Sequence, residues 1–117
     1  MKRILQLEEF AQMALGIMGL YLLPFQFSWW IWVVLFLSPD IAILSYSINK
    51  NAGAVIYNIF HHKFIAIAIG ACGLFTSNNI LMLISALLFS HAAFDRMLGF
   101  GLKYRDDFKH THLGWTK

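Results

Sequence analysis

Four long apolar stretches dominate this chain of 117 residues. They cover about residues 10–23, 29–48, 52–75 and 80–102, and only short polar breaks separate them. A helix needs about 20 residues to cross the roughly 30 Å hydrocarbon core of a bilayer, and the last three stretches reach that length. The first is shorter, so a helix there has to begin upstream, among residues 5–9. The pattern predicts an integral membrane protein.

The composition excludes an ordinary soluble globule. Hydrophobic residues make up 59% of the chain and charged residues 13%, against about 45–50% and about 25% in soluble domains. A chain of this length cannot hide so many apolar side chains from water. Strands are disfavoured, because open sheet edges cannot lie in lipid. We therefore expect an all-α fold, a four-helix transmembrane bundle in which residues 1–117 form one polytopic membrane domain.

The positive charges predict the orientation. If the N-terminus is cytoplasmic, every Lys and Arg except Lys63 lies at the cytoplasmic side or in the helix turns that lead to it. This is the positive-inside asymmetry. It predicts an inner-membrane protein with both termini in the cytoplasm and a short cytoplasmic tail at residues 104–117. The bilayer then accounts for the basic charge, and no basic stripe with interleaved aromatics indicates nucleic acid. Lys63 has to pair or to reach the interface.

The second stretch contains a helix breaker. Pro39 lacks a backbone N–H and should kink the second helix. Ser38 is then expected to act as the N-cap of a restarted helix. Asp40 would follow near the positive end of that helix, which favours an ionised carboxylate.

The ionisable groups of the apolar stretches are expected to share one depth. At 1.5 Å per residue, Asp40, His61, His91 and Asp95 all fall in the cytoplasmic half of the membrane. His91 and Asp95 are four residues apart and share a helix face, and Asn58 and His61 are three apart and do the same. We therefore expect these side chains to form a buried polar centre that opens towards the cytoplasm.

Carboxylates and imidazoles that face one another inside a helical bundle are typical of metal centres. The mixed nitrogen and oxygen set suits Zn, Fe or Mn. In this interpretation Glu8 is a further ligand or a catalytic base, and Asn58 orients a partner. A divalent ion would activate water for hydrolysis of a lipid or another apolar substrate. The predicted ligands are Asp40, His61, His91 and Asp95.

Two alternatives stay open at this point. In the first, the centre holds no metal: Asp95 pairs with Arg96, the histidines are hydrogen-bonded, and the chain is a binding or interaction module without enzymatic activity. The second concerns the tail. His110 and His112 point to one side of an extended chain, so the tail either folds back as a lid that adds ligands or is solvated, with Trp115 at the headgroups.

Short motifs spread over the chain resemble a known family. They are Leu7-Glu8, Ser28-Trp29-Trp30, Ser38-Pro39-Asp40, Tyr57-Asn58 with His61, His91 with Phe94-Asp95-Arg96, residues 98–104, Phe108-Lys109 and residues 111–114. From Leu7 to Gly114 the chain resembles the bacterial membrane family catalogued as domain of unknown function 4260. The resemblance implies a small multi-pass membrane protein and implies no activity.

Overall fold

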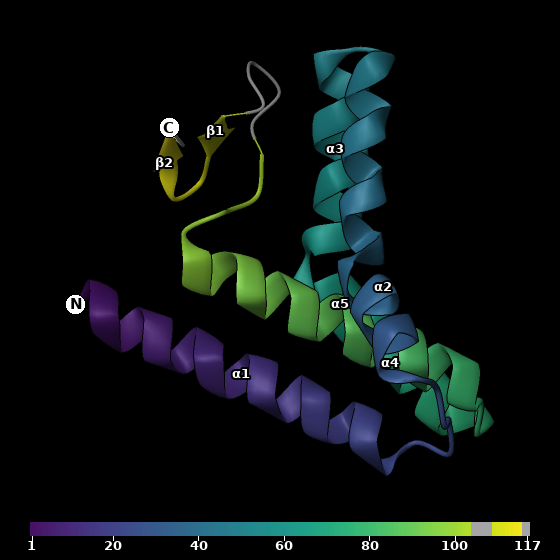
Figure 1. The fold of residues 1–117 in the computed structure, drawn as a ribbon. Coiled ribbons are helices and arrows are strands. Elements are labelled where there is room, and N and C mark those ends of the chain that lie inside the picture. Colours follow the sequence, from purple (N-terminus) through teal and green to yellow (C-terminus); the bar gives the residue numbers. More distant parts are fainter. Residues whose placement is uncertain (104–108, 116–117) are drawn as a thin grey trace.

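The chain is all-helical apart from a small hairpin at its C-terminal end. A computed structural model describes residues 1–103 and 109–115. Figure 1 shows the elements in chain order. They are α1 (Lys2–Leu22), α2 (Trp29–Leu37), the 3-10 helix η1 (Ser38–Ser47), α3 (Lys50–His61), α4 (Lys63–Thr76), α5 (Asn79–Leu98), β1 (His110–Thr111) and β2 (Gly114–Trp115).

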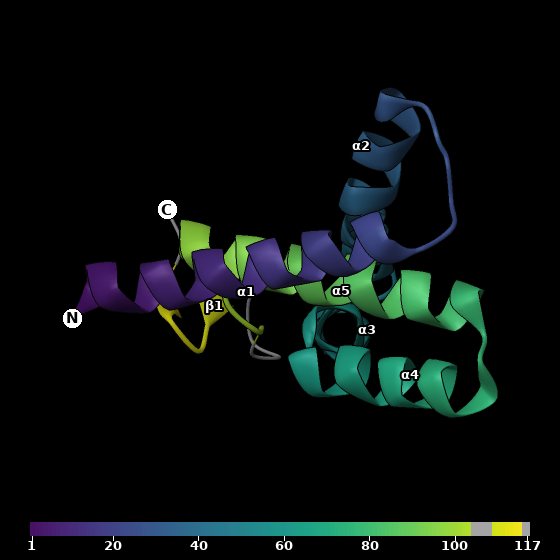
Figure 2. The same ribbon diagram turned by 90° about the horizontal axis from the view of Figure 1, so that it is seen from below.

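The helices form two groups. α1 and α4 both pack along α5, and these three helices lie side by side in Figure 2. The second group is a hairpin in which η1 packs against α3, and Figure 1 shows it standing across the first group. An apolar core formed by Leu20, Leu83 and Leu87 lies where α1 meets α5, and Trp32 of α2 packs against it.

Two of the described helices are long and apolar enough to cross a membrane. One comprises Trp29–Ser47 and the other Asn79–Leu98, and each has a mean hydropathy of 1.5. α3 and α4 meet the same test only together, as a span bent by 49°. The structure therefore supports a membrane protein with two or three candidate spans in its described part. α1, the expected first span, has 21 residues but is not among them, because Glu8 and Glu9 interrupt its apolar sequence.

The break at Pro39 takes a different form from the one expected. The α-helix passes into a 3-10 helix, and Ser38 does not act as an N-cap: its hydroxyl donates 2.6 Å back to the Leu35 carbonyl. In a regular α-helix the N–H of residue 39 would donate to this carbonyl, but Pro39 has no N–H. The side chain of Ser38 thus compensates for the missing donor, and Asp40 lies in the first turn of η1.

The third expected span is broken, and the expectation of one continuous helix was wrong. His62 has an extended backbone (φ −96°, ψ 120°) and separates α3 from α4. Its imidazole Nδ1 accepts a hydrogen bond from the Phe64 N–H, which caps the new helix. α4 then begins at Lys63, whose ammonium pairs with Glu9 and Gln12 of α1. The expected pairing of Lys63 is therefore present.

The close approach of α1 to α5 depends on one glycine. A Cβ atom at Gly16 would lie 2.0 Å from Ser90 Oγ, which is fully buried and already donates to the Ala86 carbonyl. A Cβ at Gly19, one turn away, would meet only Ala86 Cβ, at 3.9 Å. Small residues at such positions allow helices to pack closely.

We predict that Gly16→Ala destabilises the fold by about 1–3 kcal/mol, because the added methyl overpacks a filled interface. Gly19→Ala is the matched control and should be neutral or slightly stabilising. Thermal unfolding in detergent, followed by circular dichroism, compares the two variants with the parent chain. Equal stability of the two variants would contradict the close packing at Gly16.

Candidate metal centre

Three elements bring four ionisable side chains together. η1 provides Asp40, α3 provides His61, and α5 provides His91 and Asp95. One ligand atom from each side chain lies within 4.8 Å of the other three. The side chains of both histidines are no more than 1% exposed and that of Asp95 is 10% exposed, whereas that of Asp40 is 42% exposed. The group is therefore buried on all sides except that of Asp40.

The imidazoles and the carboxylates alternate around this group. His61 Nε2 lies 3.3 Å from Asp40 Oδ1 and 3.4 Å from Asp95 Oδ2. His91 Nε2 lies 3.1 Å and 3.5 Å from the same two oxygens. Each nitrogen thus faces both carboxylates, and each carboxylate faces both nitrogens.

Backbone carbonyls fix the tautomer of both rings. His61 Nδ1 lies 2.9 Å from the Tyr57 carbonyl, and His91 Nδ1 lies 2.7 Å from the Phe36 carbonyl. Because a carbonyl oxygen only accepts, each Nδ1 has to carry its proton and donate it. In the neutral imidazole, Nε2 then presents a lone pair to the centre. The same arrangement orients metal-binding histidines in proteins.

The distances at the centre are compatible with a bound metal and also with direct hydrogen bonds, since both Nε2 atoms lie within hydrogen-bond distance of Asp40 Oδ1. Charged N–H···O bonds are about 2.7–2.9 Å long, which is shorter than all four N···O separations here, 3.1–3.5 Å. A tetrahedron of ligands about 2.0–2.1 Å from a zinc ion has edges of about 3.3 Å. The two carboxylates would also balance the charge of a divalent cation. The donor set therefore fits such an ion chemically. Four of its six ligand-to-ligand distances are close to the edge of that tetrahedron, and all six are within 4.8 Å.

A second layer of side chains supports the ligands. The Tyr57 hydroxyl donates to Asp95 Oδ2 at 3.3 Å, and the Tyr57 ring stacks on His61 with centroids 3.8 Å apart. The ammonium of Lys103 lies 4.9 Å from the centroid of the Tyr57 ring. Burial lowers the pKa of Lys103. These contacts place a phenol, stabilised by a cation, directly beside two of the four ligands.

Asn58 anchors the segment that follows α5. Its amide donates to the Lys103 carbonyl at 2.8 Å, and its side-chain oxygen accepts from the Lys103 N–H at 2.6 Å. Lys103 also forms a β-bridge with Thr111, which is 2% exposed. The role of Asn58 in the structure is therefore to hold the C-terminal segment against α3.

The other predicted site residues lie outside the group of four. Glu8 is exposed on α1 and is not brought to the group of four. Arg96 does not pair with Asp95: it donates to the carbonyls of His61, at 2.9 Å, and of Phe100, at 3.2 Å.

The two tail histidines are not brought to the centre. His110 lies in β1, and His112 accepts the Leu102 N–H at 2.8 Å. The tail folds back as a β-hairpin that pairs with the chain after α5, rather than supplying ligands to the group of four. The side chain of Trp115 is outside the described residues.

Some contacts of the centre were not predicted from the sequence. Tyr57 lies four residues before His61, on the same face of α3, and this spacing could have indicated it. The Phe36 carbonyl carries no signal in the sequence, because a backbone group is present at every residue.

The fold and the site together define a class: a helical protein with spans apolar enough for a membrane and a buried cluster of two histidines and two aspartates. The chain belongs to the family described as Domain of unknown function (DUF4260), whose model matches residues 2–116. Searches of curated proteins and of solved structures find no match to this chain.

We predict that Asn58→Ala releases the C-terminal hairpin, because it removes both side-chain bonds to Lys103. The loss should be about 1–3 kcal/mol, since the buried backbone groups of Lys103 stay unsatisfied. Limited proteolysis in detergent should cut the tail faster than in the parent chain. Asn51→Ala, at an exposed position of α3, is the control and should leave the rate of cleavage unchanged.

Proposed function

We propose that this protein is an integral inner-membrane protein with four spans. It binds a divalent metal ion through Asp40, His61, His91 and Asp95. It uses this ion to hydrolyse a lipid or another apolar substrate. The convergence of four ligand atoms with fixed imidazole tautomers carries the proposal. In this proposal the bent pair of α3 and α4 counts as one span, and α1 is the fourth span.

The ligand types narrow the choice of metal. Two imidazole nitrogens and two carboxylate oxygens suit Zn, Fe or Mn. When bound, such an ion supplies Lewis acidity and lowers the pKa of a coordinated water towards neutrality. Asp40, the most exposed of the four ligands at 42%, lies on the side from which substrate and water would reach the centre.

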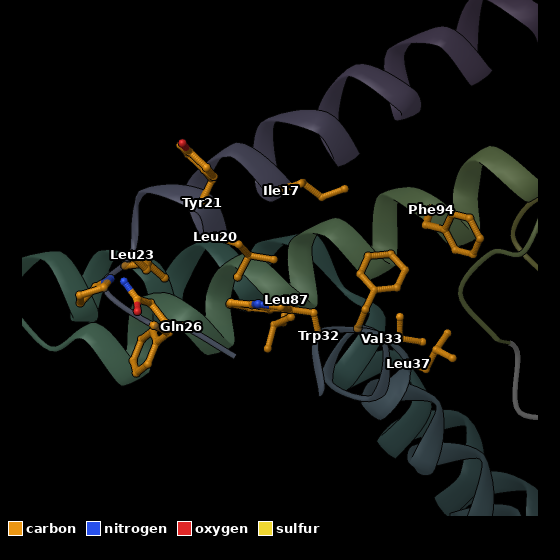
Figure 3. Close-up of a pocket in the computed structure, with 13 residues that line it drawn as sticks. Ile17, Leu20, Tyr21, Leu23, Gln26, Trp32, Val33, Leu37, Leu87 and Phe94 are labelled. Carbon is orange, nitrogen blue, oxygen red and sulfur yellow. The ribbon is translucent and has the colours of Figure 1, made fainter. Parts of the chain in front are cut away.

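An apolar cavity lies next to the centre. It has a volume of about 790 Å³ and is lined by side chains of α1, α2 and α5, several of which are drawn in Figure 3. Leu87 and Phe94 line it from α5, and His91 lies between them in the sequence. Phe36, another lining residue, packs against the rings of His91 and Phe94, each at 5.5 Å between centroids.

This position supports an acyl chain or a similar apolar chain as the occupant of the cavity. Binding sites of this size and character accept ligands of several hundred Å³. Phe36 lines the cavity and packs on the His91 ring, so a chain in the cavity would bring the head of an amphiphile towards the group of four. Hydrolysis would then add water across an ester bond near that head and release an acid and an alcohol.

Metal analysis of the purified protein tests the centre. We expect about one equivalent of Zn, Fe or Mn in the parent chain and none in His61→Ala or His91→Ala, because each variant removes one of four ligands. His62→Ala is the matched control, since His62 is adjacent, exposed and outside the group. Added metal should raise the melting temperature of the parent and not of His91→Ala, by linkage of about 4 kcal/mol at a thousandfold excess over Kd.

The metal-free alternative predicts the opposite pattern. The parent chain would then contain no metal, and His61→Ala and His91→Ala would lower stability to a similar degree with or without added metal.

Turnover of a membrane-lipid extract tests the reaction. The metal-loaded protein should release acid products that mass spectrometry detects, and chelator-treated protein and His91→Ala should release none. Val33→Trp should reduce turnover and retain the metal, because Val33 lines the apolar cavity from α2 and lies outside both the apolar core and the group of four. Metal binding without any product would contradict the enzymatic part of the proposal and leave the metal centre standing.

A further inference from the structure

A second cavity, of about 900 Å³, lies at the other end of the α1 and α5 pair. It is bordered by the first turns of α1, the start of α4, the C-terminal end of α5 and the hairpin segment. Its polar lining differs sharply from the apolar cavity beside Phe36. The ionisable side chains in its wall are Lys2, Glu9, His62, Lys63, Arg96 and His112.

The charge of this wall is unbalanced. Three cationic side chains face one carboxylate, which leaves a formal charge of +2 with neutral imidazoles. That carboxylate, Glu9, already forms an ion pair with Lys63. Among residues 1–103 and 109–115, no carboxylate oxygen lies within 4.0 Å of Arg96, whose guanidinium donates to two backbone carbonyls. Arg96 thus brings a positive charge that forms no direct ion pair within the described residues, and Asp95 and Glu9 act on it only from a greater distance.

The two imidazoles of the wall are oriented as donors. His62 Nδ1 accepts the Phe64 N–H at 3.1 Å, and His112 Nδ1 accepts the Leu102 N–H at 2.8 Å. In the neutral imidazole the proton then has to be on Nε2. This is the reverse of the tautomer at the metal centre, where Nδ1 donates. The second cavity therefore offers N–H donors where the first centre offers lone pairs.

We infer that this cavity binds an anionic phosphate group, held by Arg96, Lys63 and Lys2 with His62 and His112 as neutral donors. Guanidinium and ammonium groups are the usual partners of phosphate in proteins. The phosphate belongs either to a lipid headgroup or to a free phosphate ion, and both present the same oxygens to the wall. This inference does not depend on the metal centre.

The test uses the full chain, freed of metal by a chelator, and the His91→Ala variant, so that phosphate held by a metal is not counted. Inorganic phosphate is titrated by calorimetry in detergent. In parallel, co-purification of phosphatidic acid is compared with that of phosphatidylcholine from mixed nanodiscs. We expect Arg96→Gln to weaken binding about tenfold or more, because it removes a charged hydrogen bond. Lys2→Gln and His112→Ala should weaken it less.

Lys50→Gln is the control, because Lys50 is exposed at the start of α3 and does not line the cavity. Binding of inorganic phosphate identifies a free ion as a ligand, whereas selective retention of phosphatidic acid alone identifies a lipid headgroup. If Arg96→Gln does not fold, Lys2→Gln and His112→Ala decide the question. Absence of both kinds of binding, or an equal loss in Lys50→Gln, would overturn the inference.

Discussion

The meeting of two imidazoles with two carboxylates is the interaction on which this structure depends. Buried carboxylates are costly unless cations or hydrogen bonds compensate them. The Nδ1–H groups of the two rings do not face the carboxylates, because both donate to backbone carbonyls, those of Tyr57 and Phe36. The Tyr57 hydroxyl donates to Asp95 at 3.3 Å, and both Nε2 atoms lie within hydrogen-bond distance of Asp40 Oδ1. The compensating charge therefore has to come from protons on the rings or from a bound cation.

The irregular parts of the backbone lie beside this group. Asp40 follows Pro39 at the start of a 3-10 helix, and His61 is the last residue of α3 before the break at His62. Regular helices satisfy all their backbone groups, so a break at membrane depth is tolerated only where it is buried in protein or lines a polar cavity. In this chain the Ser38 hydroxyl and the His62 ring supply the compensating bonds. Asp40 and His61 thus both lie next to irregular backbone, and both meet His91 and Asp95 of α5.

Residue spacing was sufficient to predict part of this site. His91 and Asp95 share a face because four residues are close to one helical turn, and that relation survives any packing. Asp40 and His61 were predicted from depth alone, which holds as long as each stretch stays helical. Glu8 lies on an exposed face of α1, outside the group of four, and adjacent Glu9, about 100° around the helix, pairs with Lys63. The break at His62 involves neither Pro nor Gly, so no residue type indicated it.

The positions of the two cavities relative to α5 indicate that one ligand does not fill both. Phe94 lines the apolar cavity and Arg96 lines the basic one, and Asp95 of the metal centre lies between them. Two residues along a helix correspond to about 200° of rotation, so the cavities lie on nearly opposite sides of α5. One amphiphile could not fill both without passing around Asp95. We therefore propose the apolar cavity for the chain of a substrate, and the basic cavity, which α1, α4, α5 and the hairpin border, for a separate phosphate.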